Sequence, residues 1–583
     1  NGVRFFDAGD YDRAIQSFDY VLTINPRNFS ALVYLARAHE AKGIINKAIE
    51  YYNKAYAVNT DPRIAERLEN INEMMRKKSK GYIHSGGAAR LAGLGNMQAV
   101  VPDSAAIADP YAFGFTSFYA FRPALNTVKF SVGLKIPYEK TAMDMGGGET
   151  ENFEKTDFDA VMNLERERMN NISYRISDSG VIIITPVFGF SPEKYRIESS
   201  LTGVSEYEAS VFLAAFEAEY AQRINENISI GALVGYGTHK SFISNFLGKD
   251  DEMENSFSKF QYQISATYML PFLGSKYYIS AAAGTRSDYN PHGLPFFGSV
   301  GAMQESPFVY NHYNRESSII YEDQNNRTEI KNRFDMNSFG FSIGTGIEKY
   351  GESETAGSIS IYPGMSGSLS EEFITTSLSS GDTDSTVVES YKAIGDGLEV
   401  IARSMGRFYF DAFIVGIKIE YLNAGYKTYA DAQGTNEENI SIDYLNVSAG
   451  TALKFIDDFL IPFELFFSSG SRKAAGASEI KTEIGEIGGR AGVEYLLTEN
   501  VSLRAGGNFS RQEITLNNEP AGNSENPARN TISFSAGGGY KSGDMEINGV
   551  LGYNIHNLSP MEGGYTEYSK SAVTLLVDFK LSI

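Results

Sequence analysis

The chain ends in a segment where apolar and polar residues alternate, Ser571-Ala572-Val573-Thr574-Leu575-Leu576-Val577-Asp578-Phe579-Lys580-Leu581-Ser582-Ile583. Only Leu576 breaks the pattern. Successive side chains of a strand point to opposite faces, so the segment has one apolar face and one mostly polar face. A strand that crosses a bilayer needs about 9–11 residues, and this one is long enough. By itself it fits equally well a membrane strand and the edge strand of a soluble β-sandwich.

The same alternation recurs upstream, and this recurrence favours a closed barrel. The clearest alternating runs are 128–136, 260–270, 339–346, 408–421 and 532–538. Late in the chain, short polar connections at 498–500 and 541–544 join consecutive runs, as in hairpins. A soluble sandwich or propeller would show more regular strand spacing. We therefore predict an α + β multidomain protein in which residues 127–583 form an antiparallel transmembrane β-barrel of 14, possibly 16, strands.

In such a barrel the closing strand would present its row from Val573 to Ile583 to lipid, with Asp578 and Lys580 facing the lumen. Five long polar segments are expected to be loops outside the cell. They are 138–180, 239–258, 288–333, 363–406 and 511–530. Two of these loops are expected to contain helical stretches, at Asp157–Asn171 and Val387–Met405. The second has apolar residues three or four apart, which gives it one apolar face.

Composition excludes several classes of protein. The net charge is −21; residues 1–80 carry 13 Lys and Arg against 10 Asp and Glu, and the rest carries 38 against 62. The acidic excess of the β-rich part argues against nucleic acid as a partner. The chain has no Cys, so it has neither a disulfide framework nor a thiolate metal site. No run of 18 apolar residues is present, so no transmembrane helix is predicted.

Residues 1–78 show a helical pattern that repeats every 34 residues. The matching pairs are Gly9 with Gly43, Ala14 with Ala48, Phe18 with Tyr52, and Val21 with Ala55. This pattern resembles the tetratricopeptide repeat, in which small residues lie where the two helices of a hairpin touch. Residues 62–78 are expected to form a capping helix.

Tetratricopeptide repeats form concave surfaces that bind peptides or partner proteins, and the resemblance implies partner-binding residues at Tyr11, Tyr34 and Arg37. A passive spacer is the alternative. The chain begins inside a repeat, and about three repeats are usually needed for a stable array. We therefore expect the native protein to continue upstream, with further repeats and an export signal.

Residues 79–126 are weakly apolar, rich in small residues and interrupted by Gly and Pro, which suits a linker and a plug packed inside the barrel. Together with the strand at 127–137, parts of this region resemble the start of the FadL family of outer-membrane transporters for hydrophobic compounds. In that family the N-terminal segment forms a hatch inside the barrel and carries an Asn-Pro-Ala motif. This chain has Asp109-Pro110-Tyr111 there, so only the proline is shared. The resemblance implies hatch residues at Gly93, Gly95, Asp109, Pro110 and Tyr111.

The sequence contains no recognisable catalytic, cofactor or metal motif. Its six His residues are scattered, and none belongs to a His-Glu-x-x-His pair. No glycine-rich segment is followed by Gly-Lys-Ser/Thr, so no phosphate loop is predicted. We predict that the protein is not an enzyme and needs no cofactor.

These observations predict a bacterial outer-membrane protein with its repeats in the periplasm. FadL-like transport of a hydrophobic small molecule is the expected function. An exopolysaccharide export porin, and a barrel that anchors a secretion, motility or surface-assembly complex, stay open as alternatives. The expected partners are membrane lipid, a periplasmic protein or peptide, and a hydrophobic molecule or glycan in the barrel. If residues 86–115 lie in the lumen, they would block a polymer.

Overall fold

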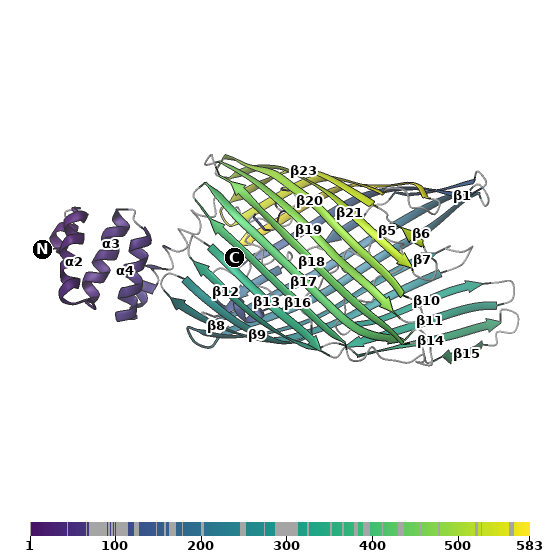
Figure 1. Cartoon of the computed structure of the whole chain (residues 1–583), viewed down its shortest axis with the longest axis horizontal. Coiled ribbons are helices and arrows are strands. Elements are labelled where there is room, and N and C mark those ends of the chain that lie inside the picture. Colours follow the sequence, from purple (N-terminus) through teal and green to yellow (C-terminus); the bar gives the residue numbers. More distant parts are fainter. Residues whose placement is uncertain are drawn as a thin grey trace.

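The computed structural model places a helical array beside one end of a large β-barrel (Figure 1). It describes residues 2–7, 9–42, 45–65, 67–68, 71, 90, 94, 97, 99–100, 115–121, 127–146, 149–156, 159–162, 171–177, 179–199, 203–244, 252–272, 275–285, 313–322, 326–337, 339–349, 353–363, 366–377, 383–388, 397–410, 412–429, 437–454, 458–475, 479–498, 500–518, 523–525, 528–558 and 565–582.

The N-terminal helices are α1 (Gly2–Asp7), α2 (Tyr11–Ile24), α3 (Phe29–Ala41) and α4 (Ile45–Val58). The side chain of Asp10 accepts a hydrogen bond from the Arg13 amide at the start of α2, and Asn28 accepts one from the Ala31 amide at the start of α3. These caps satisfy amides that have no partner within the helix. Gly9 has a φ of 76°, a left-handed conformation that favours glycine, in the turn between α1 and α2.

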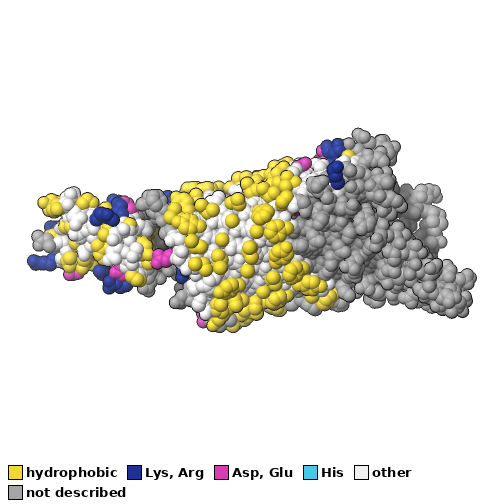
Figure 2. All heavy atoms as spheres, turned by 90° about the horizontal axis from the view of Figure 1, so that it is seen from below, with side chains coloured by type: hydrophobic (Ala, Val, Ile, Leu, Met, Phe, Trp, Pro, Cys, Tyr) yellow, Lys and Arg dark blue, Asp and Glu magenta, His cyan; other side chains and the backbone are white. Residues whose placement is uncertain are grey.

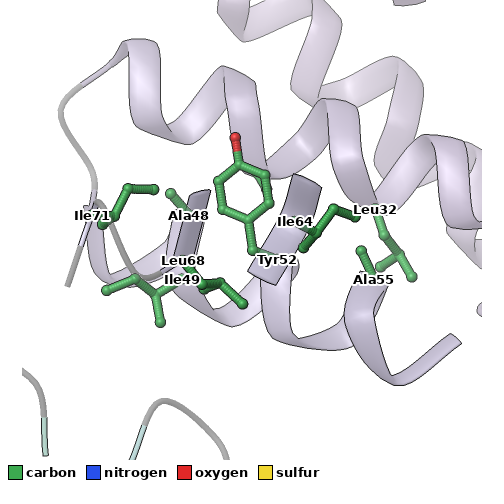
Figure 3. Close-up of a cluster of buried hydrophobic side chains, with 9 residues drawn as sticks. Leu32, Ala48, Ile49, Tyr52, Ala55, Ile64, Leu68 and Ile71 are labelled. Atoms are coloured by element: carbon green, nitrogen blue, oxygen red, sulfur yellow. The ribbon is translucent and has the colours of Figure 1, made fainter. Parts of the chain in front are cut away.

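The small and aromatic residues of the 34-residue pattern form the core of the helical array. Ala14, Ala48 and Ala55 are fully buried, and Phe18 and Tyr52 are nearly so. One cluster extends from α3 and α4 to helical residues beyond α4 (Figure 3). Its members in that further segment are Ile64, Leu68 and Ile71. The predicted contact positions of the repeat are therefore confirmed, and the described part of the predicted capping helix packs against them.

A short 3-10 helix, η2 (Thr116–Phe121), precedes the strands. The strands are β1 (Thr127–Gly146), β2 (Glu149–Thr156), β3 (Asp159–Met162), β4 (Asn171–Arg175), β5 (Gly180–Ser199), β6 (Gly203–Arg223), β7 (Ile228–Ser244), β8 (Glu252–Phe272), β9 (Ser275–Gly284), β10 (Tyr313–Glu322), β11 (Asn326–Asn337), β12 (Gly340–Lys349), β13 (Ser353–Pro363), β14 (Ser366–Ser377), β15 (Thr383–Val388), β16 (Leu398–Tyr409), β17 (Phe413–Tyr429), β18 (Glu437–Leu453), β19 (Phe459–Ala475), β20 (Glu479–Thr498), β21 (Val501–Asn518), β22 (Asn523–Glu525), β23 (Ala528–Ser542), β24 (Met545–Leu558) and β25 (Tyr565–Ser582).

The barrel closes by antiparallel pairing of its first and last strands, β1 and β25. Thr127 pairs with Ser582 at one end of this seam, and Met143 pairs with Tyr565 at the other. The structure thus confirms that the C-terminal segment seals a barrel.

Several strands share one position in the wall, because a strand is interrupted and then continues. β2, β3 and β4 together lie between β1 and β5. Five further pairs of strands each share a single position in the wall: β9 with β10, β11 with β12, β13 with β14, β15 with β16, and β22 with β23. The closed barrel therefore has 18 strands. The predicted count of 14 or 16 was too low.

The count was low because polar strands were taken for loops. The wall position shared by β2, β3 and β4, and most of the position shared by β15 and β16, lie in segments expected to be external loops. The predicted helix at Val387–Met405 is also wrong, since Leu398–Tyr409 pairs along its whole length with β17. At the other predicted helix, the described residues include strand β3. A strand wall that rises beyond the bilayer has no lipid face, so its residues need not alternate between apolar and polar.

Short turns gather at one end of the barrel. They include 224–227 and 543–544. The turn at Gly543 has a φ of 56°, as expected for a tight hairpin. Figure 1 shows the helical array and the C-terminus at this end. The longest strands, β6 and β8, have 21 residues. That is about 70 Å of strand, so the wall extends past the bilayer at the opposite end.

Apolar side chains cover the outside of the half of the barrel next to the helical array (Figure 2). On β25, Val573, Leu575, Val577 and Leu581 are 38–41% exposed, whereas Asp578 is only 4% exposed. The predicted outward row and the inward Asp578 are confirmed for these residues; Ile583 lies outside the described residues. A closed barrel with an apolar outer band is the architecture of an outer-membrane protein. Within the described part of the chain, no helix is long and apolar enough to span a membrane.

Candidate functional site

The chain between the repeats and β1 lies inside the barrel wherever the structure describes it. Arg90, Leu94, Met97, Ala99 and Val100 are completely buried. Residues 115–120 are also buried. Their partners are inward-facing side chains of the barrel wall near the short-turn end. We call the described residues 90, 94, 97, 99, 100 and 115–121 the plug segment.

Arg90 joins the plug segment to the wall through a buried ion pair. Its Nε donates to Glu494 Oε1 at 3.0 Å and its second terminal nitrogen donates to Glu494 Oε2 at 2.7 Å. Arg504 Nε donates to the same Glu494 at 2.6 Å and continues the network to Asn548 at 2.7 Å. This two-pronged geometry fixes Arg90 in position. A buried ion pair adds little net stability, but losing one partner leaves a costly unpaired charge.

The backbone of Ala99 is held from both sides. Its amide donates to Glu464 Oε2 at 2.7 Å, and its carbonyl accepts from Arg407 Nε at 3.0 Å. Glu464 also accepts from Arg490 at 2.7 Å, and Arg407 lies 3.7 Å from Glu354. Wall charges of both signs thus satisfy the buried amide and carbonyl groups of Ala99.

Apolar contacts surround these polar ones. Leu94, Met97 and Val100 pack with wall residues of β16, β17, β18 and β19, namely Tyr409, Ile414, Ala452 and Leu460. Gly416 lets the plug approach the wall closely, since a Cβ there would lie 2.0 Å from the Ala99 carbonyl oxygen. Contacts this close require glycine.

The second part of the plug segment, η2, is held by hydroxyl groups. Thr116 Oγ1 donates to Glu219 at 2.7 Å, and the Ser117 amide donates to Ser265 Oγ at 2.9 Å. The Ser117 hydroxyl lies 2.8 Å from the Thr267 hydroxyl. The Ser117 carbonyl accepts from Ser229 Oγ at 2.7 Å. Both backbone groups of Ser117 are therefore satisfied by the wall strands β7 and β8.

Aromatic and aliphatic side chains also hold η2 against the barrel wall. Phe118 meets Tyr278 edge-on with ring centroids 5.0 Å apart. Tyr119 and Ala120 pack on β5 and β6, through Val181, Ile183 and Ala221. Gly231 is required here, because a Cβ would lie 2.4 Å from the Ser117 amide nitrogen. The two parts of the plug segment together touch wall strands from β5 round to β20.

The predicted hatch residues Gly93, Gly95, Asp109, Pro110 and Tyr111 all lie outside the described residues. The wall residues that hold the plug, chiefly Glu464 and Glu494, were not among the predicted site residues. One signal was available for Glu464: it is a single charge between Phe463 and Leu465 in an otherwise apolar stretch of strand. An inward charge in such a stretch implies a partner inside the barrel.

The wall farther from the short-turn end is polar on its inner face where it is described. Glu420 of β17 lies 3.1 Å from Lys418 and 3.8 Å from Arg403, and accepts from Asn446 at 3.2 Å. Beyond the plug, this sector of the lumen therefore presents paired charges.

The helical array has a separate groove of about 780 Å³. Phe6, Phe29, Tyr34, Arg37, Glu40 and Arg67 are among its lining residues. The Arg37 guanidinium lies 5.1 Å from the Phe6 ring centroid and 5.6 Å from that of Tyr34, in cation–π range. Tyr34 and Arg37, two of the predicted partner-binding residues, thus lie together in the groove. Tyr11 contacts Phe6 at 5.6 Å between ring centroids.

Two titratable groups of the helical array are perturbed by burial. The Tyr52 hydroxyl donates to Glu40 at 2.9 Å, and burial together with this carboxylate raises the pKa of Tyr52 well above its usual range. Burial lowers the pKa of His39, and Lys47 lowers it further. His39 stacks on Tyr51 with ring centroids 5.4 Å apart. Across the described ranges, no group of three or more His, Asp or Glu residues could hold a metal ion.

Comparison with known proteins gives one match of family level. A tetratricopeptide-repeat model matches residues 1–62. The helical array carries this repeat. A comparison with curated proteins finds no match.

The chain is similar to several solved structures of channels and uptake receptors, each with low sequence identity. The toluene transporter TodX of Pseudomonas putida is 11% identical with a TM-score of 0.29, over 86% of this chain and 99% of TodX. The monoaromatic hydrocarbon channel CymD is 12% identical with a TM-score of 0.27, over 86% and 99%. The ferric yersiniabactin uptake receptor FyuA of Yersinia pestis is 7% identical with a TM-score of 0.37, over 79% and 81%. The function proposed below rests on the geometry of the barrel.

Proposed function

We propose that the chain is a plugged outer-membrane channel that moves a hydrophobic small molecule in the manner of FadL-like transporters. The supporting observation is the plug segment, which contacts inward-facing residues of wall strands from β5 to β20 near the short-turn end. A channel filled in this way needs only a small rearrangement to admit a small molecule.

The same observation weighs against export of a polysaccharide. A polymer needs a continuous bore wide enough for a sugar chain, and Arg90, Ala99 and Ser117 are held in the lumen by buried hydrogen bonds. The apolar surfaces that plug and wall share, at Leu94 and Phe118, favour an apolar cargo.

The orientation follows from the turns. In outer-membrane barrels the short turns face the periplasm, and the helical array lies at the short-turn end (Figure 1). On this proposal residues 1–78 are a periplasmic docking module, 79–126 a linker and plug, and 127–583 the channel.

Transport assays test the proposal. The full chain is produced in the outer membrane of a bacterium that lacks hydrocarbon channels, and uptake of radiolabelled toluene and of a long-chain fatty acid is measured beside a neutral hexasaccharide. We expect several-fold faster uptake of at least one apolar probe and background uptake of the hexasaccharide. Passage of the hexasaccharide alone would instead support an export porin.

A barrel that anchors an assembly is the second candidate, and the groove favours it. Arg37 lies over two aromatic rings there and can add a charge contact to an apolar one. The variants Tyr34→Ala and Arg37→Glu test this role, with Tyr20→Ala as control, because Tyr20 is exposed and does not line the groove. An anchor requires that the groove variants disrupt surface assembly while the wild-type chain shows no uptake of any probe.

A further inference from the structure

The plug segment has two anchors with different chemistry. The ionic anchor consists of Arg90 and Ala99 with their wall partners Glu494, Glu464 and Arg407. The hydroxyl anchor consists of η2 with Glu219, Ser229, Ser265 and Thr267. The ionic anchor contacts wall residues of strands β16–β20, and the hydroxyl anchor contacts wall residues of strands β6–β8.

Chain connectivity distinguishes the anchors. η2 ends at Phe121 and β1 begins at Thr127, and a chain this short spans about 20 Å at most. The hydroxyl anchor is therefore tethered to the wall whatever the rest of the plug does. The ionic anchor lies on the other side of η2, toward the repeats. Any pull from the repeats reaches Arg90 before it reaches Ser117.

The arrangement of the contacts also differs. In η2, consecutive residues contact several wall strands through aromatic side chains and through hydrogen bonds made mostly with hydroxyl groups. In the ionic anchor, hydrogen bonds converge on one side chain, that of Arg90, and on the backbone amide and carbonyl of Ala99. The charged wall partners keep other partners when these bonds break. Glu494 retains Arg504, and Glu464 retains Arg490.

We propose that the channel opens by release of the ionic anchor while the hydroxyl anchor stays in place. This regulation rests on the transport function proposed above. The retained wall pairs, Glu494 with Arg504 and Glu464 with Arg490, make the released state accessible, because neither carboxylate is left as an unpaired charge. Arg90 moves from a buried pair into the water of the opened lumen.

Two single variants open the channel by different means. Glu494→Gln removes the charge that holds Arg90. Gly416→Ala places a Cβ where it would lie 2.0 Å from the Ala99 carbonyl oxygen, so it displaces the plug without altering any charge. Gly549→Ala is the matched control, because a Cβ there meets nothing within 4 Å. In planar bilayers we expect Glu494→Gln and Gly416→Ala to raise the open fraction at least about tenfold, and Gly549→Ala to leave it unchanged.

Disulfide locks identify the anchor that moves, and the chain has no native Cys to interfere. Leu94→Cys with Gly492→Cys locks the ionic side, since a Cβ at Gly492 would lie 3.3 Å from the Leu94 Cα. Ser117→Cys with Thr267→Cys locks the hydroxyl side, where the two hydroxyls are 2.8 Å apart. Each pair of positions is in direct contact, as a disulfide requires. Each lock is combined with Gly416→Ala and measured oxidised and reduced.

The proposal expects the 94–492 lock to close the channel when oxidised and to reopen it on reduction. It expects the 117–267 lock to leave the channel open in both states. Closure by the 117–267 lock, or an open channel with the 94–492 lock, would overturn the proposal. Ion conductance reports the release of the ionic anchor and does not depend on which molecule the channel transports. If Gly416→Ala conducts ions but toluene uptake stays at background, the proposed transport of a hydrophobic molecule is wrong, whereas the proposed release of the ionic anchor still holds.

Discussion

At the scale of single residues, inward charges decide how the barrel is filled. Glu464 and Glu494 lie in the lumen and hold the plug through Ala99 and Arg90. Their ion pairs contribute little net stability, because desolvation offsets most of the attraction. Their effect is positional, since they fix Arg90 and the amide of Ala99 at one place on the wall in the closed channel.

Outward-facing residues in the membrane-spanning part of the same wall must instead be apolar, because they contact lipid. Val577 of β25 points to lipid, whereas Thr574 lies on the inner face with Asp578. Val577→Lys should weaken folding into bilayers by up to about 2–4 kcal/mol, the cost of a lysine near the midplane, and Thr574→Lys should have much less effect. Urea titration of the chain in lipid vesicles measures both. Equal losses in the two variants would contradict the membrane-facing assignment of Val577.

At the scale of elements, the strands separate into two kinds. Near the short-turn end their residues alternate between lipid and lumen, as in β8, where Phe260 and Ile264 are exposed and Gln261 and Gln263 are buried. Strands such as β11 and β14 are mostly polar and pair with each other. Only the first kind has a period that sequence alone can detect, because only that part of the wall contacts lipid.

The helices offer a test of burial through pH. His39 of α3 is buried and its pKa is lowered by burial from the ordinary value of 6.5. The unfolded chain therefore takes up the proton more readily than the folded helix does. The contribution of His39 to stability is complete above about pH 6.5 and is lost as the pH falls through the folded pKa.

We expect the melting temperature of the helical array to fall between about pH 7.5 and pH 5.5, and to fall less in His39→Gln, which cannot titrate there. Circular dichroism of the full chain at a helix-specific wavelength follows this melting. Identical slopes for the two proteins would show that His39 takes up its proton without unfolding.

At the scale of the whole molecule, the helical array and the barrel have separate cores. Among the described residues, the buried clusters of the array contain only residues of the array, and those of the barrel only residues of the plug and wall. Elements that share no core unfold as separate cooperative units.

Two thermal transitions should follow from this division. The helical signal should be lost at a lower temperature than the β-sheet signal, because the barrel wall has a closed ladder of hydrogen bonds with no edge. Ala48→Asp, which buries a charge in the array core, should lower the first transition and leave the second in place. A single transition that shifts as a whole in this variant would indicate one cooperative unit.

The sequence by itself determined the helical repeat, the barrel and the direction of the lipid face. Each of these depends on a periodic pattern, the 34-residue repeat of Ala14 and Ala48 or the two-residue alternation that ends at Leu581. The tertiary structure decided the strand number of 18 and which wall residues hold the plug. Polar strands beyond the bilayer carry no period, and Arg90 is 404 residues from the Glu494 that holds it. Such pairs depend on how the closed wall brings distant strands round to one lumen, which no local pattern encodes.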